Sequence, residues 1–346
     1  MAYEIPTYED NRIPLNRNLT YEEMVSYIDE LYDKRLMANK FLHADWLQQR
    51  SYVSGDQYRV INKKTFTFER LSNVKGYQER EVYNRMRTLR ATYIARITRN
   101  KPHPYAQSTT LNERDKEIAR ITNIVLRDEV IQQKMMSKID KIAAYIADYG
   151  SAFMKVDWNK NLGNIAYDKF LKKRNEIENN HTLNPRFKEH LLQKIDAGTP
   201  IYQGGPETNI LTAFQVFVDN YNREGLDDTD NILIARAFPK ETLKLIYNLT
   251  DDDFKDEQIN SYTKQGGITA YNESPYTTSY GYDVVRLQGH ALLMEYYEMP
   301  SPMYSDGRYI MKIGKKIIYE GSLPYINGDN GKRTFPIIRV VADDDT

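Results

Sequence analysis

The sequence contains no cysteine. This absence excludes disulfide bonds, thiolate zinc sites and a cysteine nucleophile, and it is typical of proteins that work in a reducing compartment. An excess of either charge is also missing, because 48 lysines and arginines balance 48 aspartates and glutamates among 346 residues. A chain without net charge exerts little long-range attraction on nucleic acid or on an anionic membrane. The composition therefore disfavours repressor-like and histone-like proteins.

Long apolar runs are absent as well. The longest, around Ile210–Val218, is far below the roughly 18–20 residues that a membrane span needs. The first residues, MAYEIPTYEDNRIP, lack the apolar core of a signal peptide. Apolar residues make up 40% of the chain, enough for a buried core, while a mean hydropathy of −0.69 leaves much polar surface. We expect two or three domains and no membrane partner.

The recurrent short motifs of enzymes are missing too. The glycine pairs Gly204-Gly205 and Gly266-Gly267 are not followed by the Lys-Ser or Lys-Thr of a phosphate-binding loop, and neither GxGxxG nor GxSxG occurs. No two histidines have the HxxxH or HxH spacing of a metal site; they are His43, His103, His181, His190 and His290. We predict a protein that is not an enzyme, with no catalytic, cofactor-binding or metal-binding residues.

Two acidic clusters leave an alternative open. One is the run Asp251-Asp252-Asp253, and the other consists of Asp227, Asp228 and Asp230. A metal site needs carboxylates that converge from separate places in the chain. We expect the first cluster to begin a helix and the second to lie in a solvated turn. The alternative is a metal-dependent nucleic-acid-processing enzyme that uses these aspartates.

Tyrosine is abundant, with 28 residues. Its side chain is amphipathic and loses little entropy when it is held, so tyrosine suits large interfaces. A compositional bias of the genome explains the same count equally well.

The N-terminal part predicts helices after an arm over residues 1–18. The first helix begins with a capping box of Thr20 and Glu23, and its apolar spacing continues to about Trp46. The partly alternating stretch 58–70 indicates a strand or an irregular strand pair.

Two further helices follow. The pattern over Tyr77–Asn100 has apolar residues at steps of three and four. A second capping box at Thr110–Glu113 opens a long helical pattern that ends at Tyr149-Gly150, where glycine is expected. If it is unbroken, this helix is about 50 Å long at 1.5 Å per residue.

Charge is distributed in blocks. Between Gly76 and Pro102, seven basic residues stand against two acidic ones, whereas the window 219–257 has eleven acidic and five basic residues. The arginines surround the predicted helix, which favours a solvated or subunit-facing surface over a phosphate-binding one. The two oppositely charged elements either meet across a subunit boundary in a ring or simply face water.

The C-terminal part is richer in predicted strands. We expect a strand over Ser151–Trp158, a charged helix-prone insertion over 167–197, and a strand over Phe214–Val218 that ends at an acidic turn. A strand over Ile232–Ala237 leads to a helix opened by Pro239.

Beyond a Tyr-, Ser- and Thr-rich loop, the remaining pattern is β. The expected strands are Val285–Tyr297, Arg308–Ile313, Lys316–Tyr319 and Phe335–Val341.

Three blocks resemble the portal proteins of short-tailed bacteriophages, including the crAss-like group. The first, Tyr145–Trp158, is a helix that ends in glycine and leads into a strand. The second, Phe214–Tyr247, is a strand ending at Asp219, an Asp-rich turn, a strand that begins with Asp-Asn-Ile, and a helix. The third, Leu292–Phe335, contains LLMEYYEMP and GRYIMKIGKKIIYEG and is closed by FPIIRV. The resemblance rests on the order of these blocks, since none is a short catalytic motif.

The resemblance implies an α+β fold with portal architecture: a wing of helices and strands, a stem helix and a β-rich clip. It places the N-terminal arm and wing in 1–238, with the insertion 167–197, and the first stem helix in 239–262. A loop over 263–283 then leads to the clip-like region 284–342. The family's chain continues with a second stem helix, more wing and a crown, whereas this sequence ends at Thr346.

The resemblance also implies a function. The chain would form a ring of about twelve copies at one vertex of the virion capsid, assembled in the host cytoplasm, as the channel for genome packaging and ejection. Its partners would be the major capsid protein, the terminase, head–tail adaptor proteins and the double-stranded DNA in the channel. The candidate residues that face DNA or a partner are Arg308, Lys312, Lys315 and Lys316. Another ring-forming virion adaptor is a further alternative.

Overall fold

The computed structural model describes two compact units, one formed by Met1–Met154 and Ile210–Thr346 and the other by Lys155–Asn209. We call them unit 1 and unit 2. The residues described are 20–54, 59–61, 68–70, 81–99, 104–108, 110, 112–159, 162, 167–179, 188–189, 192, 204–218, 226, 229–247, 249–254, 289–302, 304–326 and 333–341.

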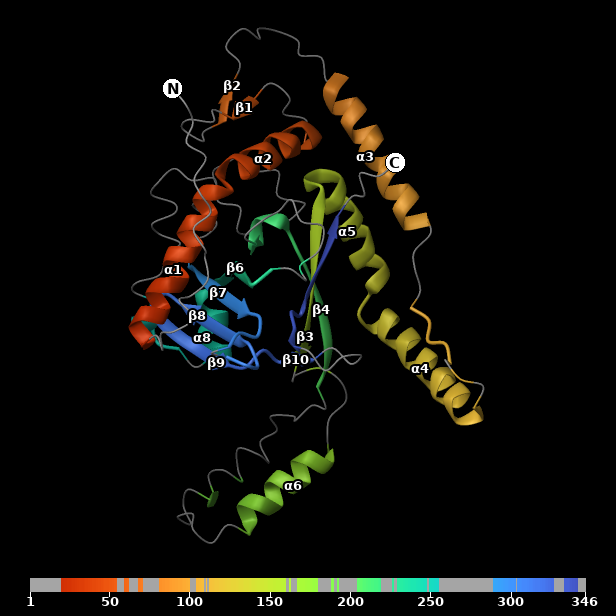
Figure 1. The fold of residues 1–346 in the computed structure, drawn as a ribbon, viewed down its shortest axis with the longest axis vertical. Coiled ribbons are helices and arrows are strands. Elements are labelled where there is room, and N and C mark those ends of the chain that lie inside the picture. The colour runs from red at the N-terminus through yellow and green to blue at the C-terminus, as the bar shows by residue number, and fades with distance from the viewer. Residues whose placement is uncertain are drawn as a thin grey trace. The chain divides into compact units, whose positions relative to one another are not determined.

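Helices and strands are mixed, which confirms the α+β class (Figure 1). The α-helices are α1 (Tyr21–Ala38), α2 (Lys40–Ser54), α3 (Glu81–Arg99), α4 (Glu113–Gln132), α5 (Met135–Tyr149), α6 (Tyr167–Glu178) and α8 (Lys240–Tyr247). Two 3₁₀ turns cover Ala213–Gln215 and Asp251–Phe254. Among the described residues, no helix is both long and apolar enough to cross a membrane.

The strands form four sheets. They are β1 (Arg59–Ile61), β2 (Phe68–Arg70), β3 (Ser151–Asn159), β4 (Gly205–Leu211), β5 (Val216–Phe217), β6 (Asn231–Pro239), β7 (His290–Glu298), β8 (Arg308–Ile313), β9 (Lys316–Gly321), β10 (Tyr325–Ile326), β11 (Arg333–Thr334) and β12 (Ile337–Val341). The largest sheet has the order β5-β6-β7-β8-β9, and a three-stranded sheet has the order β12-β3-β4. The pairs β1-β2 and β10-β11 stand as separate two-stranded sheets.

The N-terminal helix begins as predicted and ends earlier. Thr20 and Glu23 form the expected capping box, in which the backbone N–H of Thr20 donates to the Glu23 carboxylate over 2.9 Å. The prediction of one helix to Trp46 is wrong, because Asn39 leaves the helical conformation and separates α1 from α2. Leu31 and Tyr32 of α1 belong to one apolar cluster, whereas Trp46 of α2 belongs to another. The break lets each helix direct its own face to the core.

The long helix predicted to end at Gly150 is also broken. Lys134 has a φ of 51°, in the left-handed region, and it separates α4 from α5. The predicted capping box at Thr110–Glu113 is wrong as well, because the cap is Asn112, whose side chain accepts from the backbone of Arg114. The predicted glycine end is confirmed, since Gly150 has a φ of 76° and its N–H donates to Ile146.

Strands β6 and β7 hold the five-stranded sheet together. They pair antiparallel over nine residues, from Asn231 opposite Glu298 to Pro239 opposite His290. The regions expected as wing (up to 238) and clip (284–342) therefore share one sheet among the described residues. The helix expected over 239–262 is shorter, because α8 ends at Tyr247 and a 3₁₀ turn follows at Asp251–Phe254.

Other strand predictions hold in part. The strands predicted near 58–70, 151–158, 232–237, 308–313 and 316–319 are present as β1 with β2, β3, β6, β8 and β9. The strand predicted over Phe214–Val218 begins instead as a 3₁₀ turn at Ala213–Gln215, followed by the two residues of β5. The predicted loop 263–283 lies outside the described residues.

The sheet is buried on both faces. Along β6, Ile232 and Ile234 belong to one apolar cluster, whereas Leu233 and Ala235 belong to another that contains Ile28 of α1. This alternation is the period of two that a strand imposes on its side chains. Both faces of β6 therefore contribute to the core of unit 1.

A histidine lies among the aromatic side chains of this core. His43 stacks on Trp46 with 5.3 Å between ring centroids and lies 5.3 Å from Phe214 and 6.0 Å from Phe217. Its buried Nε2 finds no hydrogen-bond partner within the described part of the chain. Burial disfavours the charged imidazolium and lowers the pKa of His43 from 6.5 to about 4.

We predict that this histidine destabilises the fold in acid. The unfolded chain takes up a proton at His43 below pH 6.5, whereas the folded chain does so only near pH 4, so stability falls as pH falls through this window. The full loss is up to about 3 kcal/mol. Urea unfolding at several pH values should show that the His43→Phe variant lacks this part of the loss. Equal pH dependence in the two proteins would contradict the assignment.

A second prediction concerns the two left-handed positions. A Cβ added at Gly150 would meet nothing within 4 Å, so Gly150→Ala should destabilise the protein by about 1 kcal/mol through the backbone alone. Lys134→Gly should act in the opposite direction and stabilise by roughly 0.5 kcal/mol, because it removes a strained side-chain position but adds chain entropy. Thermal unfolding of both variants measures the two signs, and a destabilising Lys134→Gly would show that the left-handed conformation there is wrong.

Candidate functional site

The sequence predicted a basic surface at Arg308, Lys312, Lys315 and Lys316. Arg308, at the start of β8, is buried and donates from Nη2 to Glu298 over 2.8 Å, across the β7–β8 pair. Its guanidinium also lies 4.2 Å from the centre of the Tyr304 ring. Arg308 is therefore paired with a neighbouring carboxylate within the sheet and is not a surface charge of this chain.

Lys312 is still more enclosed. Its side chain is 1% exposed, and its Nζ lies 2.5 Å from Asp29 of α1 and 3.1 Å from the carbonyl of Gly314. Burial lowers the pKa of Lys312, and the charge of Asp29 opposes this shift. Nearby, burial and the charge of Asp29 raise the pKa of Asp33. The lysine acts as the counter-ion of the acidic side of α1.

The two remaining residues lie at the β8–β9 turn. The Lys316 ammonium pairs with Asp253 over 2.9 Å, and the Lys315 carbonyl accepts from the hydroxyl of Tyr21. Lys315 is exposed. The structure thus places the four predicted residues along one strand and its turn, but it buries two of them and pairs a third with a carboxylate.

The aspartates of the enzyme alternative are held by lysines. Asp251 lies 2.6 Å from Lys244, and Asp253 accepts from the backbone N–H of Thr250 over 2.8 Å. The Thr250 bond and then the Lys316 ammonium lower the pKa of Asp253. These contacts begin the 3₁₀ turn, as expected for a helix start. Asp227 and Asp228 lie outside the described residues, and the described part of the chain has no group of three potential metal ligands.

A polar network inside the sheet was not predicted. Glu295 of β7 is 1% exposed and is contacted by Arg236 of the neighbouring strand and by the hydroxyl of Tyr297 at 2.8 Å. The ring of Tyr297 stacks on Tyr309 with 4.5 Å between centroids, and Tyr309 lies 5.3 Å from Tyr319. The alternation of β7 contained this signal, because one glutamate stands among apolar residues. A carboxylate so fully satisfied is suited to fixing the strands rather than to proton transfer.

The N-terminal helix is joined to the sheet by another buried cation. Arg35 donates to the carbonyl of Phe217 over 2.8 Å and to the side chain of Asn231 over 2.5 Å. Together with Lys312–Asp29, this contact connects α1 to β5, β6 and β8. Lys312, which was a candidate for DNA binding, instead holds α1 on the sheet, and Arg35 does the same.

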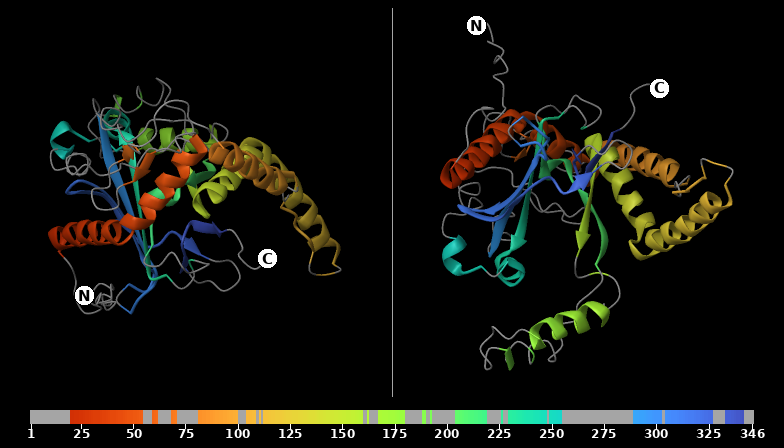
Figure 2. Two further views of the ribbon diagram at one scale, coloured as in Figure 1. Left: turned by 90° about the horizontal axis from the view of Figure 1, so that it is seen from above. Right: turned by 60° about the horizontal axis from the view of Figure 1, so that its bottom comes forward.

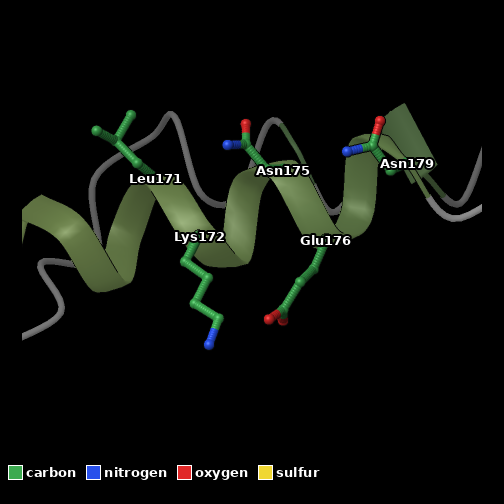
Figure 3. Close-up of a pocket in the computed structure, with 5 residues that line it drawn as sticks. All are labelled: Leu171, Lys172, Asn175, Glu176 and Asn179. Atoms are coloured by element: carbon green, nitrogen blue, oxygen red, sulfur yellow. The ribbon is translucent and has the colours of Figure 1, made fainter.

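Two hollows occur in the described surface. One lies along α6 of unit 2 and has a volume of about 530 Å³. In Figure 3, its Leu171, Asn175 and Asn179 point to one side of the helix, while Lys172 and Glu176 point to the other. These side chains diverge, so they do not form a site.

The other hollow lies between the start of α5, the segment before α4, and α4 itself. It has a volume of about 830 Å³ and is lined mainly by apolar side chains, among them Tyr105, Leu126, Val130, Ile131 and Met136. It lies beside a group of exposed apolar side chains on α4, one of which, Ile131, also lines it.

This α4 surface consists of five β-branched residues, each between 50% and 69% exposed: Ile118, Ile121, Ile124, Val125 and Ile131. No residue of α4 is fully buried, although its apolar pattern is that of a helix packed on a core. Monomeric proteins seldom expose a continuous apolar patch of this kind unless it serves binding. We therefore regard the α4 surface as the candidate functional site.

We predict that Lys312 is structural. Lys312→Met leaves Asp29 without its counter-ion beside Asp33 and should destabilise the protein by about 3 kcal/mol in urea unfolding. The double variant Lys312→Met/Asp29→Asn should recover at least about 1 kcal/mol, because the uncompensated charge is gone. Lys315→Met, on the exposed turn, should change stability by less than about 0.5 kcal/mol. Equal effects at positions 312 and 315 would contradict the burial of Lys312.

The comparisons with known proteins add nothing to these physical features. No protein-family model matches the chain, and no curated protein matches it.

Proposed function

We propose that this chain is a structural subunit of a phage portal, a ring of about twelve copies at one capsid vertex through which DNA enters and leaves the virion. The resemblance described from the sequence motivates the family. The observation that carries the assembly is the exposed apolar surface of α4.

The three resembling blocks fold into consecutive elements. The first is the end of α5, Gly150 and β3, and the second is the 3₁₀ turn at Ala213–Gln215, β5, β6 and α8. The third contains β7, β8 and β9. Each block is thus a unit of local structure, and this supports a resemblance that depends on the order of elements.

The α4 surface supports self-association by its chemistry. Burying an apolar side chain of this size contributes about 1.5–3 kcal/mol when it is fully removed from water, and here about half of each side chain remains to be covered. In a ring, every subunit presents the same surface once, so the gain is repeated at each contact. Interfaces of obligate assemblies are correspondingly apolar.

The charges of the chain suit a channel through which DNA slides. Each phosphate contact adds salt-dependent affinity and would hold the DNA in place. The chain has no net charge, and Arg308 and Lys312 are buried against carboxylates. These features support passage over tight binding.

Terminase, the major capsid protein and the head–tail adaptors are the proposed partners, and the virion vertex is the proposed location. Another ring-forming virion adaptor would share these physical properties and would differ in its position in the particle. A metal-dependent enzyme is less well supported, because Asp251 and Asp253 are paired with lysines.

Negative-stain electron microscopy of the purified protein tests the proposal. We expect rings of about twelve subunits with an axial hole. Ile121→Glu/Val125→Glu should abolish the rings while leaving the monomer folded by circular dichroism, because it places charges on the α4 surface. Glu113→Gln, at a 90% exposed carboxylate of the same helix, is the matched control and should assemble normally.

A protein that stays monomeric at all concentrations, or rings unaffected by the α4 charges, would contradict this assignment. Nuclease activity that requires Mg²⁺ or Mn²⁺ and is lost in Asp251→Asn/Asp253→Asn would favour the enzyme instead.

A further inference from the structure

The rotation of α3 is fixed by one ion pair. Arg90 forms two bonds with Asp148 of α5, from Nε over 2.5 Å and from Nη2 over 2.9 Å. The half-buried residues Met86, Ile94 and Ile97 lie on the same side of the helix as Arg90 at 100° per residue. The opposite side of α3 therefore faces away from α5.

That outer side carries arginines, and its one acid is Glu81, the first residue of the helix. Arg85, Arg96 and Arg99 lie within one narrow stripe along the helix, together with Leu89. The stripe extends for about 20 Å at 1.5 Å per residue. No aspartate or glutamate occurs between residues 83 and 99. We call these four residues the basic face of α3.

The basic face has the composition of a protein interface. Leu89 is 67% exposed, and phosphate contacts along a nucleic acid would leave this side chain uncovered. Arginine and large apolar side chains are enriched together at protein–protein interfaces. Arg96 and Arg99, next to Leu89, therefore suit a partner that supplies carboxylates beside apolar side chains.

Such a surface exists on α1 of the same chain. Its inner side is buried, with Met24, Ile28, Leu31, Tyr32 and Arg35 against the sheet. Its exposed side carries Glu22, Glu30 and Asp33, followed by Met37 at 65% exposure. At 100° per residue these four side chains lie within one stripe, which we call the acidic face of α1.

The acidic face carries three carboxylates, and Lys312 pairs with Asp29 beside it. Burial and then the charge of Asp29 raise the pKa of Asp33, and Lys312 opposes this shift. A guanidinium supplied from outside would relieve this repulsion.

The two faces cannot meet within one chain. Within unit 1, α2 lies between α1 and α3 along the chain and contacts both. Figures 1 and 2 show α1 and α3 on opposite sides of unit 1, the first in red and the second in orange. A subunit with complementary surfaces on opposite sides associates head to tail.

We propose that the basic face of α3 docks on the acidic face of α1 in a second copy of the chain. This contact rests on the proposed ring and adds a charged contact to the one that the α4 surface makes there. It joins unlike surfaces, so each copy binds one neighbour with α3 and another with α1. Repulsion between two basic or two acidic faces excludes head-to-head pairing.

The absence of cysteine makes a direct test possible. In Glu30→Cys/Arg96→Cys, mild oxidation should join α1 of one copy to α3 of the next and give a ladder of covalent multimers on a denaturing gel. The matched control is Glu30→Cys/Arg87→Cys, because Arg87 lies on the far side of α3 from Arg96, beside Tyr83. We expect at least tenfold less multimer from this control.

Charge reversal provides an independent measurement on the full chain. Arg96→Glu and Glu30→Lys should each lower the assembled fraction in sedimentation velocity, and the combination of the two in one chain should restore it. Thermal unfolding confirms that each variant is folded.

The outcomes separate the two proposals. If wild-type rings form but the two cysteine pairs cross-link equally, the α1–α3 contact is wrong and the ring remains. If wild-type protein gives neither rings nor multimers, both are wrong. If Arg96→Glu/Arg99→Glu instead loses binding to a short DNA duplex while assembly is unchanged, the basic face is a nucleic-acid surface and the docking proposal is overturned.

Discussion

The pairing of β6 with β7 is the contact on which unit 1 depends. Nine residue pairs connect two segments that lie about fifty positions apart in the sequence, and β5, β8 and β9 add to their edges. Closing so long a connection costs entropy, and the alternation of β6 repays it by filling clusters on both faces of the sheet. A slip of one residue would exchange the two faces and displace every contact with α1.

Buried charge gives this sheet its specific partner. Arg35 and the Lys312–Asp29 pair join α1, near the N-terminus, to β5, β6 and β8 in the C-terminal half of the chain. Such pairs contribute little net stability after desolvation, but an alternative position of α1 would leave their charges unpaired. Glu295 fixes the β6–β7 register in the same way, through Arg236 and Tyr297. Specificity here comes from the cost of the wrong arrangement.

Local patterns in the sequence predicted local structure. The Thr20 capping box, the helix end at Gly150 and several strands were foreseen because neighbouring residues determine them. The breaks at Asn39 and Lys134 were missed, because the apolar spacing continues past both residues and lysine is not a usual helix terminator. Lys312 and Arg308 were taken as surface charges, because a sequence does not show which carboxylate lies opposite.

The tyrosines illustrate the same limit. Tyr297 stacks on Tyr309, and Tyr309 contacts Tyr319, so the three rings meet across three strands of a single chain. An abundance of tyrosine therefore does not by itself indicate an interface. The α4 surface was not predicted, because its apolar spacing is that of a core helix, whereas no described residue of α4 is fully buried in the fold.

The left-handed residue between α4 and α5 has a geometric consequence for the α4 surface. The direction of α4 relative to α5 is set at Lys134, within a single residue of backbone. A change in those two dihedral angles would tilt the apolar side of α4 while leaving the sheet and its core intact. The direction in which the α4 surface faces is therefore determined by one bend of the main chain, separately from the packing of the sheet.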